Sequence, residues 1–210
     1  MIGKNDDGII DSLKKKILME ADALRRIAAQ IDGACAEAAG LISDCRGRVV
    51  VTGLGKTGHI GKKIAASFAS LGIPAFFVHS CEALHGDMGM ITEDDVVIMI
   101  SNSGESPEIL NMLPSLKIIG PKTVSITNSR ESLLAKETDV VILCDAGEEI
   151  DENGLAATTS AVAALAIGDA LATVVSRKKG FGKKDFAINH PGGALGQKLL
   201  KEYLERVNTA

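Results

Sequence analysis

Short runs of apolar residues recur along this chain from about residue 48 onward, with amphipathic stretches between them. The runs are continuous rather than alternating, which is typical of strands buried on both faces of a parallel sheet. The stretches between the runs carry the three- and four-residue spacing of helices. Strands that alternate with helices in this way indicate an α/β fold. The five predicted strands are residues 49–52, 75–78, 96–100, 123–127 and 140–143.

Helical periodicity accounts for most of the remaining chain. Between residues 8 and 43 apolar side chains recur every three or four positions, and Gly33 divides this region into two helices. We therefore predict a three-layer domain with a doubly wound, five-stranded parallel sheet, preceded by a helical arm. The predicted divisions are the N-terminal arm at 1–46, the α/β domain at 47–200 and a C-terminal tail at 201–210. The later helices are predicted at residues 59–71, 107–118, 131–136 and 156–177.

Composition narrows the class of protein. The chain has 210 residues, of which 46% are hydrophobic and 22 are glycine, which suits one α/β domain with many tight turns. Its net charge is −4, and aromatic residues make up only 3% of it with no Trp. Neither the basic surface nor the stacking platform of a nucleic-acid binder is therefore expected. We predict no nucleic-acid partner, and a bound anion has to be held by a local loop.

The cysteines and the N-terminus predict a cytoplasmic protein. The four cysteines are widely spaced without a CxxC pair, as expected for reduced thiols. The first residues contain no apolar core of a signal peptide. Residues 155–175 are apolar enough to raise the question of a membrane span, but they include Asp169 and three threonines. A buried core helix explains this segment better, so no membrane partner is predicted.

The densest cluster of short polar residues follows the third predicted strand, where residues 101–106 read Ser-Asn-Ser-Gly-Glu-Ser. Pro107 then begins a predicted helix. A strand–turn–helix of this kind aims N–H groups and hydroxyls at one point, where the helix dipole attracts an anion, although an ordinary helix cap uses the same residue types. The predicted phosphate ligands are Ser101, Asn102, Ser103 and Ser106, with Thr158 or Ser160 nearby.

The loop after the first strand reads Gly-Leu-Gly-Lys-Thr-Gly at residues 53–58, which fits the G-x-G-x-x-G pattern of a dinucleotide site. That pattern also needs an acid at the end of the second strand, where residues 77–79 read Phe-Val-His. A Walker A loop needs a glycine where this chain has Val50. Both departures weaken the nucleotide interpretations without removing them, and they stand beside a tight turn with a solvent-exposed lysine and a direct phosphate contact. The candidate ligands in this loop are Gly55, Lys56 and Thr57.

Histidines and carboxylates on further loops are candidates for acid–base chemistry. Residues 79–90 hold two histidines, one of them His85, and two acids; their spacing matches no standard zinc pattern, so no metal is predicted. Glu108 lies in the first turn of a predicted helix, where an acid also stabilises the dipole. Glu149 lies in an acidic stretch of a type that is usually solvated. His190 is followed by a rigid Pro-Gly-Gly turn, which suits a positioned acid or base.

Taken in this order, these segments resemble the sugar-isomerase (SIS) domain and, more narrowly, the D-arabinose 5-phosphate isomerases of the Kdo pathway. The resemblance covers nearly the whole chain from about residue 48. Many relatives continue into a paired CBS module, whereas this sequence ends at Ala210, so we expect a form without CBS domains. The matching segments are GLGKTGHIGKK at 53–63, FFVH and EALHGDMGM up to residue 90, ISNSGES at 100–106, GLAATTS at 154–160, GDALA at 168–172 and DFAINHPGGALGQKLL at 185–200.

The resemblance implies a flavodoxin-like fold and an aldose–ketose isomerase. Its substrates would be D-ribulose 5-phosphate and D-arabinose 5-phosphate, interconverted through an enediol without a cofactor, and its product would serve Kdo synthesis for lipopolysaccharide or capsule. It also implies a homotetramer with active sites shared between subunits, in which His190 completes the site of a neighbour. The alternatives are an isomerase of another sugar phosphate and a non-catalytic SIS domain that senses sugar phosphates.

The catalytic residues that the resemblance implies are Lys56, His85, Glu108, Glu149 and His190. A carboxylate has to move the proton between C1 and C2, and we expect Glu149 or Glu108, with Glu149 preferred because its loop precedes the Thr/Ser-rich start of a helix. His190 and His85 are expected to open the sugar ring and move hydroxyl protons. Lys56 is expected to stabilise developing negative charge or to hold the phosphate.

Overall fold

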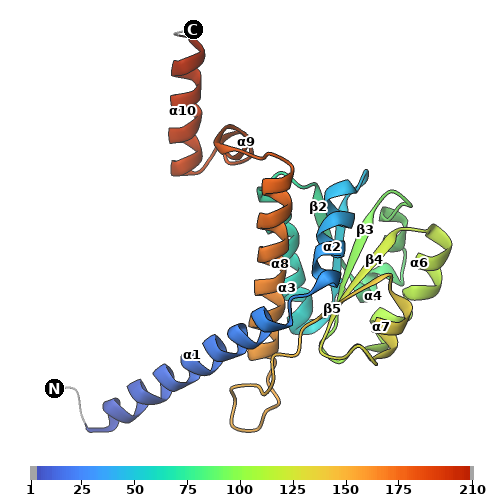
Figure 1. Cartoon of the computed structure of the whole chain (residues 1–210), viewed down its shortest axis with the longest axis vertical. Coiled ribbons are helices and arrows are strands. Elements are labelled where there is room, and N and C mark those ends of the chain that lie inside the picture. Colours follow the sequence, from blue (N-terminus) through green and yellow to red (C-terminus); the bar gives the residue numbers. More distant parts are fainter. Residues whose placement is uncertain (1–3, 209–210) are drawn as a thin grey trace.

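The computed structural model describes residues 4–208, and the side chains of residues 7–205. Within these residues, five parallel strands form one sheet in the order β2-β1-β3-β4-β5 (Figure 1), which confirms the predicted doubly wound fold. Each strand begins and ends within one residue of its predicted position, because the apolar runs are the segments that both helical layers cover. The strands are β1 Val49–Gly53, β2 Ala75–His79, β3 Val96–Ile100, β4 Lys122–Thr127 and β5 Val140–Leu143.

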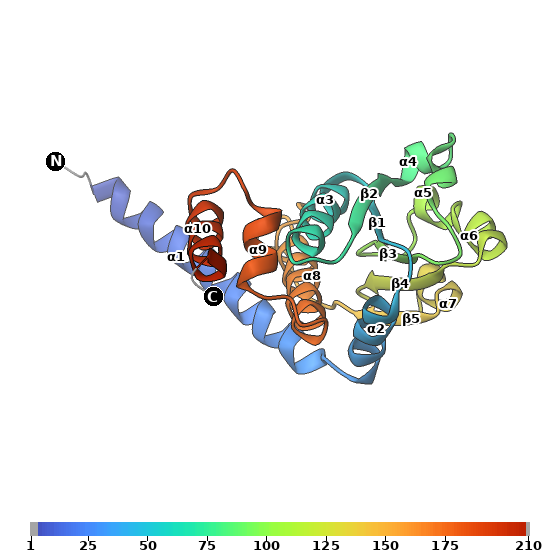
Figure 2. The ribbon, with the colours of Figure 1, turned by 90° about the horizontal axis from the view of Figure 1, so that it is seen from above.

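Helices cover both faces of this sheet, and each face has its own apolar core (Figure 2). The long helices lie on one face and the short ones on the other. The first face carries α2 Gly33–Asp44, α3 Gly55–Ser70 and α8 Thr159–Lys178. The second face carries α4 Ser80–Ala83, α5 Pro107–Leu110, α6 Leu113–Ile119 and α7 Leu133–Glu137.

The first core layer depends on close contact between α3 and α8. A Cβ atom on Gly168 would lie 2.5 Å from side-chain atoms of Ile64, so only glycine allows this approach. Helix α8 is long and apolar enough to cross a membrane by length and composition, but 61% of its most apolar window is buried inside the structure. It is a core helix of the domain, as the sequence predicted.

Several helix boundaries differ from the prediction. The helix expected over residues 107–118 is two short helices, α5 and α6. Pro114 lies in the first turn of α6, and because it has no N–H it cannot donate to the carbonyl of Leu110 and continue α5. Helix α3 begins four residues earlier than predicted, at Gly55. Two helices near the C-terminus were not predicted: α9 Lys183–Asn189 and α10 Ala194–Asn208.

The predicted helical arm contains two helices with different surroundings. Helix α2 buries Ala38 and Ile42 in the core, so it belongs to the helical layer of the domain. Helix α1, Lys4–Gln30, packs only its C-terminal part there, through residues such as Ile27, and its N-terminal part stands away from the domain (Figure 1). That part exposes an apolar stripe in which Ile17 is 68% exposed.

Candidate active site

The predicted site segments meet at the carboxyl edge of the sheet. Strand β1 lies between β2 and β3, and its last residue, Gly53, pairs with His79 on one side and Ile100 on the other. The loops that follow these three strands therefore leave the sheet at one level and side by side, because neighbouring strands are about 4.8 Å apart. Ligands of doubly wound sheets bind at this point, where the strand order reverses.

The loop of residues 101–106 is folded on itself by its own hydroxyls. Ser101 is buried, and its Oγ accepts the N–H of Gly104 at 3.1 Å and lies 3.1 Å from Oγ of Ser106. Ser103 is exposed, and its Oγ accepts the N–H of Glu105 at 3.2 Å. The backbone N–H groups of Asn102, Ser103 and Ser106 make no hydrogen bond within the described part of the chain. They are free to bind an anion.

Contacts with the neighbouring strand fix this loop. The carbonyl of Asn102 accepts the N–H of Asn128 at 2.9 Å and the hydroxyl of Thr127 at 3.1 Å. Gly104 has a φ of +67°, and a Cβ there would lie 2.2 Å from Oγ of Ser132. Only glycine combines this left-handed backbone with so close an approach. The loop is thus held in one shape before any ligand binds.

Lys56 lies beside this loop, at the start of α3. Its turn is made by Gly55, which has a φ of +56°, and by Thr57, whose hydroxyl donates to the carbonyl of Leu54 at 2.7 Å. The Thr57 hydroxyl therefore serves its own turn, whereas Lys56 is exposed. Helix α3 has 16 residues and presents the positive end of its dipole here, while α5 has only four residues. Beside the hydroxyl-rich loop, the dipole therefore comes from α3 rather than from the short helix after Pro107.

Glu149 is the most strongly held of the predicted catalytic residues. Its Oε2 accepts the N–H of Thr158 at 2.8 Å and the hydroxyl of Thr158 at 2.9 Å, and its Oε1 accepts the hydroxyl of Ser160. Burial raises the pKa of this carboxyl, but the hydrogen bonds from Ser160 and Thr158 outweigh burial and hold the pKa below its usual value. Thr158 and Ser160, predicted near the phosphate, here bind Glu149 and keep it ionised.

Because the pKa of Glu149 is lowered in the folded chain, we expect the free energy of unfolding to depend on pH. A carboxyl whose pKa is lower in the folded than in the unfolded chain stabilises the fold fully above the unfolded pKa of about 4.3, and this contribution is lost as the pH falls through the folded pKa. We expect Glu149→Gln to lower the free energy of unfolding at pH 7 and to lower it progressively less below about pH 4. Urea unfolding at several pH values measures this difference.

The control for that experiment is Glu148→Gln. Glu148 is the exposed neighbour of Glu149, and its carboxylate makes no hydrogen bond to the described residues. It should change stability little at any of these pH values. A Glu149→Gln difference that stays constant from neutral to acidic pH would show that the hydrogen-bonded carboxylate is not the source of the stabilisation.

His85 and Glu108 lie on segments that leave the same edge of the sheet. His85 follows α4 and is exposed, and its segment continues from the end of β2. Glu108 lies in the first turn of α5, directly after the hydroxyl-rich loop, and is half-buried. Neither side chain makes a hydrogen bond or ion pair with the described residues. Both are therefore available to a ligand at this edge.

His190 lies at the other end of the domain. Its Nδ1 is 2.8 Å from the carbonyl oxygen of Phe186, so Nδ1 carries a proton, and its Nε2 is 2.8 Å from the hydroxyl of Ser70. Ser70 is the last residue of α3, while Lys56 is near its first. Fourteen residues at a rise of about 1.5 Å each separate these two positions by about 21 Å along the helix. The structure does not bring His190 to the site of its own chain.

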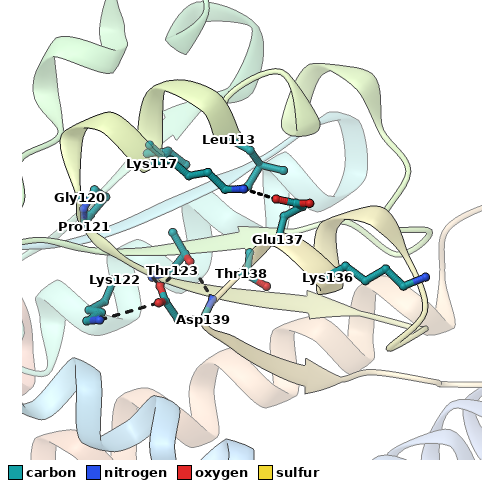
Figure 3. A pocket seen from close by; sticks show the side chains of 11 residues that line it. Leu113, Lys117, Gly120, Pro121, Lys122, Thr123, Lys136, Glu137, Thr138 and Asp139 are labelled. Carbon is teal, nitrogen blue, oxygen red and sulfur yellow. Dashed lines mark hydrogen bonds and ion pairs between the residues drawn. The ribbon is translucent and has the colours of Figure 1, made fainter.

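A polar hollow of about 380 Å³ opens at the opposite edge of the sheet, beside the start of β4 (Figure 3). Three lysines line it, but two are neutralised there, Lys117 by Glu137 and Lys122 by Asp139 at 3.8 Å. The third, Lys136, points away from the hollow (Figure 3). The hollow is separate from the predicted site and does not present the uncompensated charge that a phosphate needs. Among the residues that the structure describes, no three metal-ligating side chains come together.

Two polar side chains that no sequence pattern singles out contact the predicted residue His190 and the loop that carries Glu149. Ser70 binds His190, from which it is separated by 120 positions. Gln30, in the last turn of α1, forms two hydrogen bonds with the backbone of Asp145, which is 115 positions away. Both residues sit in ordinary helical patterns, so nothing local distinguishes them. Only the packing of distant segments shows their partners.

A parallel sheet of order 2-1-3-4-5 with a preformed, hydroxyl-rich loop at its switch point defines a doubly wound α/β protein, with free backbone N–H groups at the place where ligands of such sheets bind. The family model of the SIS domain matches residues 41–174, and the chain belongs to this family. The predicted family is thereby confirmed.

Relatives are similar over most of this chain. Arabinose 5-phosphate isomerase KdsD of Pseudomonas aeruginosa is 48% identical over 191 residues, which are 91% of this chain and 59% of that protein. Arabinose 5-phosphate isomerase KpsF of Escherichia coli O6:H1 is 45% identical over 196 residues, 93% of this chain and 60% of that protein. The chain thus spans about 60% of the length of these curated relatives.

A solved structure is similar over nearly its whole length. The structure of E. coli CFT073 c3406 in complex with arabinose 5-phosphate superimposes with a TM-score of 0.87 at 42% identity. The match covers 89% of this chain and 99% of that one. This chain therefore shares its fold with a protein that binds arabinose 5-phosphate.

Proposed function

We propose that this chain is an aldose–ketose isomerase that interconverts D-ribulose 5-phosphate and D-arabinose 5-phosphate. The observation that carries the proposal is the similarity to a structure in complex with arabinose 5-phosphate, at 42% identity over 99% of that chain. Two relatives named arabinose 5-phosphate isomerase support it. The site supports it as well, because a preformed anion loop, a lysine and two carboxylates leave the same edge of the sheet.

The direct test is an isomerase assay of the purified chain. We expect conversion of arabinose 5-phosphate to ribulose 5-phosphate, with kcat/KM much larger than for hexose and heptose phosphates. Preference for a six- or seven-carbon substrate would replace the proposal by an isomerase of another sugar phosphate. Tight binding of arabinose 5-phosphate without turnover of any substrate would identify a sensor.

The residues of the site can supply the three steps of the reaction. A cyclic aldose has to open, a proton has to move between C2 and C1, and negative charge on the enediol oxygens has to be stabilised. Glu149 is held in its ionised form and can accept the C–H proton, and Glu108 is the other candidate. His85 can move hydroxyl protons, and His190 can do so in a site to which a second copy brings it. Lys56 supplies positive charge beside the phosphate loop. None of these steps needs an electron carrier.

The phosphate group is proposed to bind the loop of residues 101–106. We expect Ser103→Ala to raise KM and to weaken substrate binding by about 1–3 kcal/mol, because a hydrogen bond to a charged group is lost. Steady-state kinetics with arabinose 5-phosphate measures this effect. The change should leave kcat nearly unaltered, since the phosphate is remote from C1 and C2.

Ser129→Ala is the matched control for this substitution. Ser129 makes the same type of turn, accepting the N–H of Glu131 at 3.1 Å as Ser103 accepts that of Glu105 at 3.2 Å. It follows the next strand of the sheet and is not assigned to the phosphate. Equal effects of the two substitutions on KM would mean that loop stability, rather than phosphate binding, is being measured.

We propose further that the active site is shared between subunits of a homotetramer. The separation of about 21 Å along α3 between Lys56 and the position of His190, given by the helical rise, supports a His190 that acts outside the site of its own chain. A second copy can bring its own His190 to that site. The exposed apolar stripe of α1, in which Ile17 is 68% exposed, offers a surface that assembly would bury.

The cellular role follows from the resemblance. We propose a cytoplasmic enzyme whose product is used for Kdo, in lipopolysaccharide or capsule synthesis. All four cysteines are free thiols, which supports a reducing compartment. Burial raises the pKa of Cys144 to about 12, so this thiol stays protonated and unreactive. Loss of Kdo from cells that depend on this gene alone would test the pathway.

A further inference from the structure

Helix α1 contacts the loop between β5 and α8, the loop that carries Glu149, at two points: Lys16 near the middle of the helix and Gln30 at its end. The amide of Gln30 binds the backbone of Asp145 twice, with Nε2 donating to the carbonyl at 2.8 Å and Oε1 accepting the N–H at 3.1 Å. Lys16, roughly four turns earlier, donates to the carbonyl of Ile150 and lies 2.9 Å from a carboxylate oxygen of Glu152. Two side chains of one helix thus hold both ends of the stretch 145–150.

The same loop is held from its other side by the first turn of α8. Thr158 and Ser160 bind the carboxylate of Glu149, and the hydroxyl of Thr158 also accepts the N–H of Ile150 at 3.2 Å. The carboxylate is therefore fixed by α8, while the backbone before and after it is fixed by α1. Without α1, the stretch 145–150 would be held only by its chain connection to β5, where the N–H of Cys144 donates to the carbonyl of Thr127, and by the contacts of Glu149 and Ile150 with Thr158 and Ser160.

We propose that Gln30 and Lys16 are positioning residues for Glu149, and this proposal rests on the proposed isomerase function. Lys16 acts through its hydrogen bond to the carbonyl of Ile150. Its ion pair with Glu152 contributes little, because the Glu152 side chain is 87% exposed and water screens the pair. Gln30 is uncharged and binds one N–H and one carbonyl of the backbone, so its effect is independent of salt. Together the two side chains make α1 a support of the active site.

Loss of this support has a specific kinetic signature. A base that is misplaced by about 1 Å reacts up to about 100-fold more slowly, and a loop that samples the correct position only part of the time loses less. We expect Gln30→Met and Lys16→Met each to lower kcat by about 10-fold. KM should change by less than about twofold, because substrate binding is dominated by the separate loop at residues 101–106.

The experiment measures kcat, KM and amide hydrogen exchange of the full chain for both variants. The matched control is Lys14→Met, which removes the same charge from the same helix, where Lys14 pairs only with Asp11 at 3.7 Å among the described residues. We expect faster exchange in residues 144–153, unchanged exchange in residues 101–106 and lower kcat for the two variants, with none of these changes in the control.

Three outcomes would overturn the proposal. Unchanged exchange in residues 144–153 would show that α1 does not hold the loop. Faster exchange with unchanged kcat would show that the contact is structural and does not position Glu149. Equal effects of Lys14→Met would assign the change to the charge or stability of α1. Failure of the proposed function would be recognised separately, because the unmodified chain would then lack isomerase activity. The exchange measurement would still show whether α1 holds the loop.

Discussion

Glu149→Gln is expected to lower kcat by at least about 100-fold, the usual contribution of a general base. The substituted amide has nearly the same shape and can still accept a hydrogen bond from Thr158 or Ser160, so the loop should stay in place. It cannot take a proton from carbon. Because the hydrogen bonds hold the pKa of Glu149 below its usual value, the carboxylate is ionised at neutral pH and ready to act as a base. Steady-state kinetics with arabinose 5-phosphate measures the loss.

Hydrogen exchange between substrate and solvent separates the two candidate carboxylates. In D₂O, the variant that lacks the base should incorporate no deuterium at C2 of arabinose 5-phosphate during long incubation. A variant that lacks another function should incorporate deuterium while forming little product. If Glu149→Gln keeps full activity and Glu108→Gln loses it, the base is Glu108. This comparison is necessary because the hydrogen bonds that lower the pKa of Glu149 also make its carboxylate a weaker base.

Mixed assemblies of two inactive variants should regain activity. We expect His190→Ala and Glu149→Gln each to be inactive alone, and their co-expressed mixture to reach about a quarter of the wild-type activity. In a symmetric pair that exchanges His190, about half of the pairs are mixed, and each mixed pair has one intact site and one doubly defective site. Purification through two different affinity tags isolates the mixed assemblies, in which the expected activity is about half.

The result depends on where His190 acts. If it served the site of its own chain, no mixed assembly would contain an intact site and no activity would return, which would contradict the shared-site proposal. A tandem-tag mixture of His190→Ala with Lys56→Ala should behave like the first mixture. A mixture of Lys56→Ala with Glu149→Gln should stay inactive, because both residues are proposed to belong to one chain's part of the site.

Much of the fold could be predicted from local pattern. The strands were predicted to within one residue because a strand covered on both faces has to be apolar at nearly every position, and the apolar runs of this chain mark those segments. The helix expected over 107–118 was wrong because its periodicity continues through Pro114, whose missing N–H ends one helix and begins another. The pattern of apolar residues shows which positions are buried, but it does not show where a backbone N–H is missing, as at Pro114.

The candidate site was predictable in its chemistry but not in its contacts. Local pattern was enough to show which polar loops leave the carboxyl edge, because parallel strands all point the same way. The structure adds that β1 pairs with β3, so that residues 53–58 lie beside residues 101–106. Packing between elements then set three contacts that no local pattern contains: Thr158 and Ser160 with Glu149, Ser70 with His190, and Gln30 with Asp145. These contacts join residues as far as 120 positions apart. Periodicity describes one element at a time, whereas a hydrogen bond between elements depends on the packing that brings them within about 3 Å.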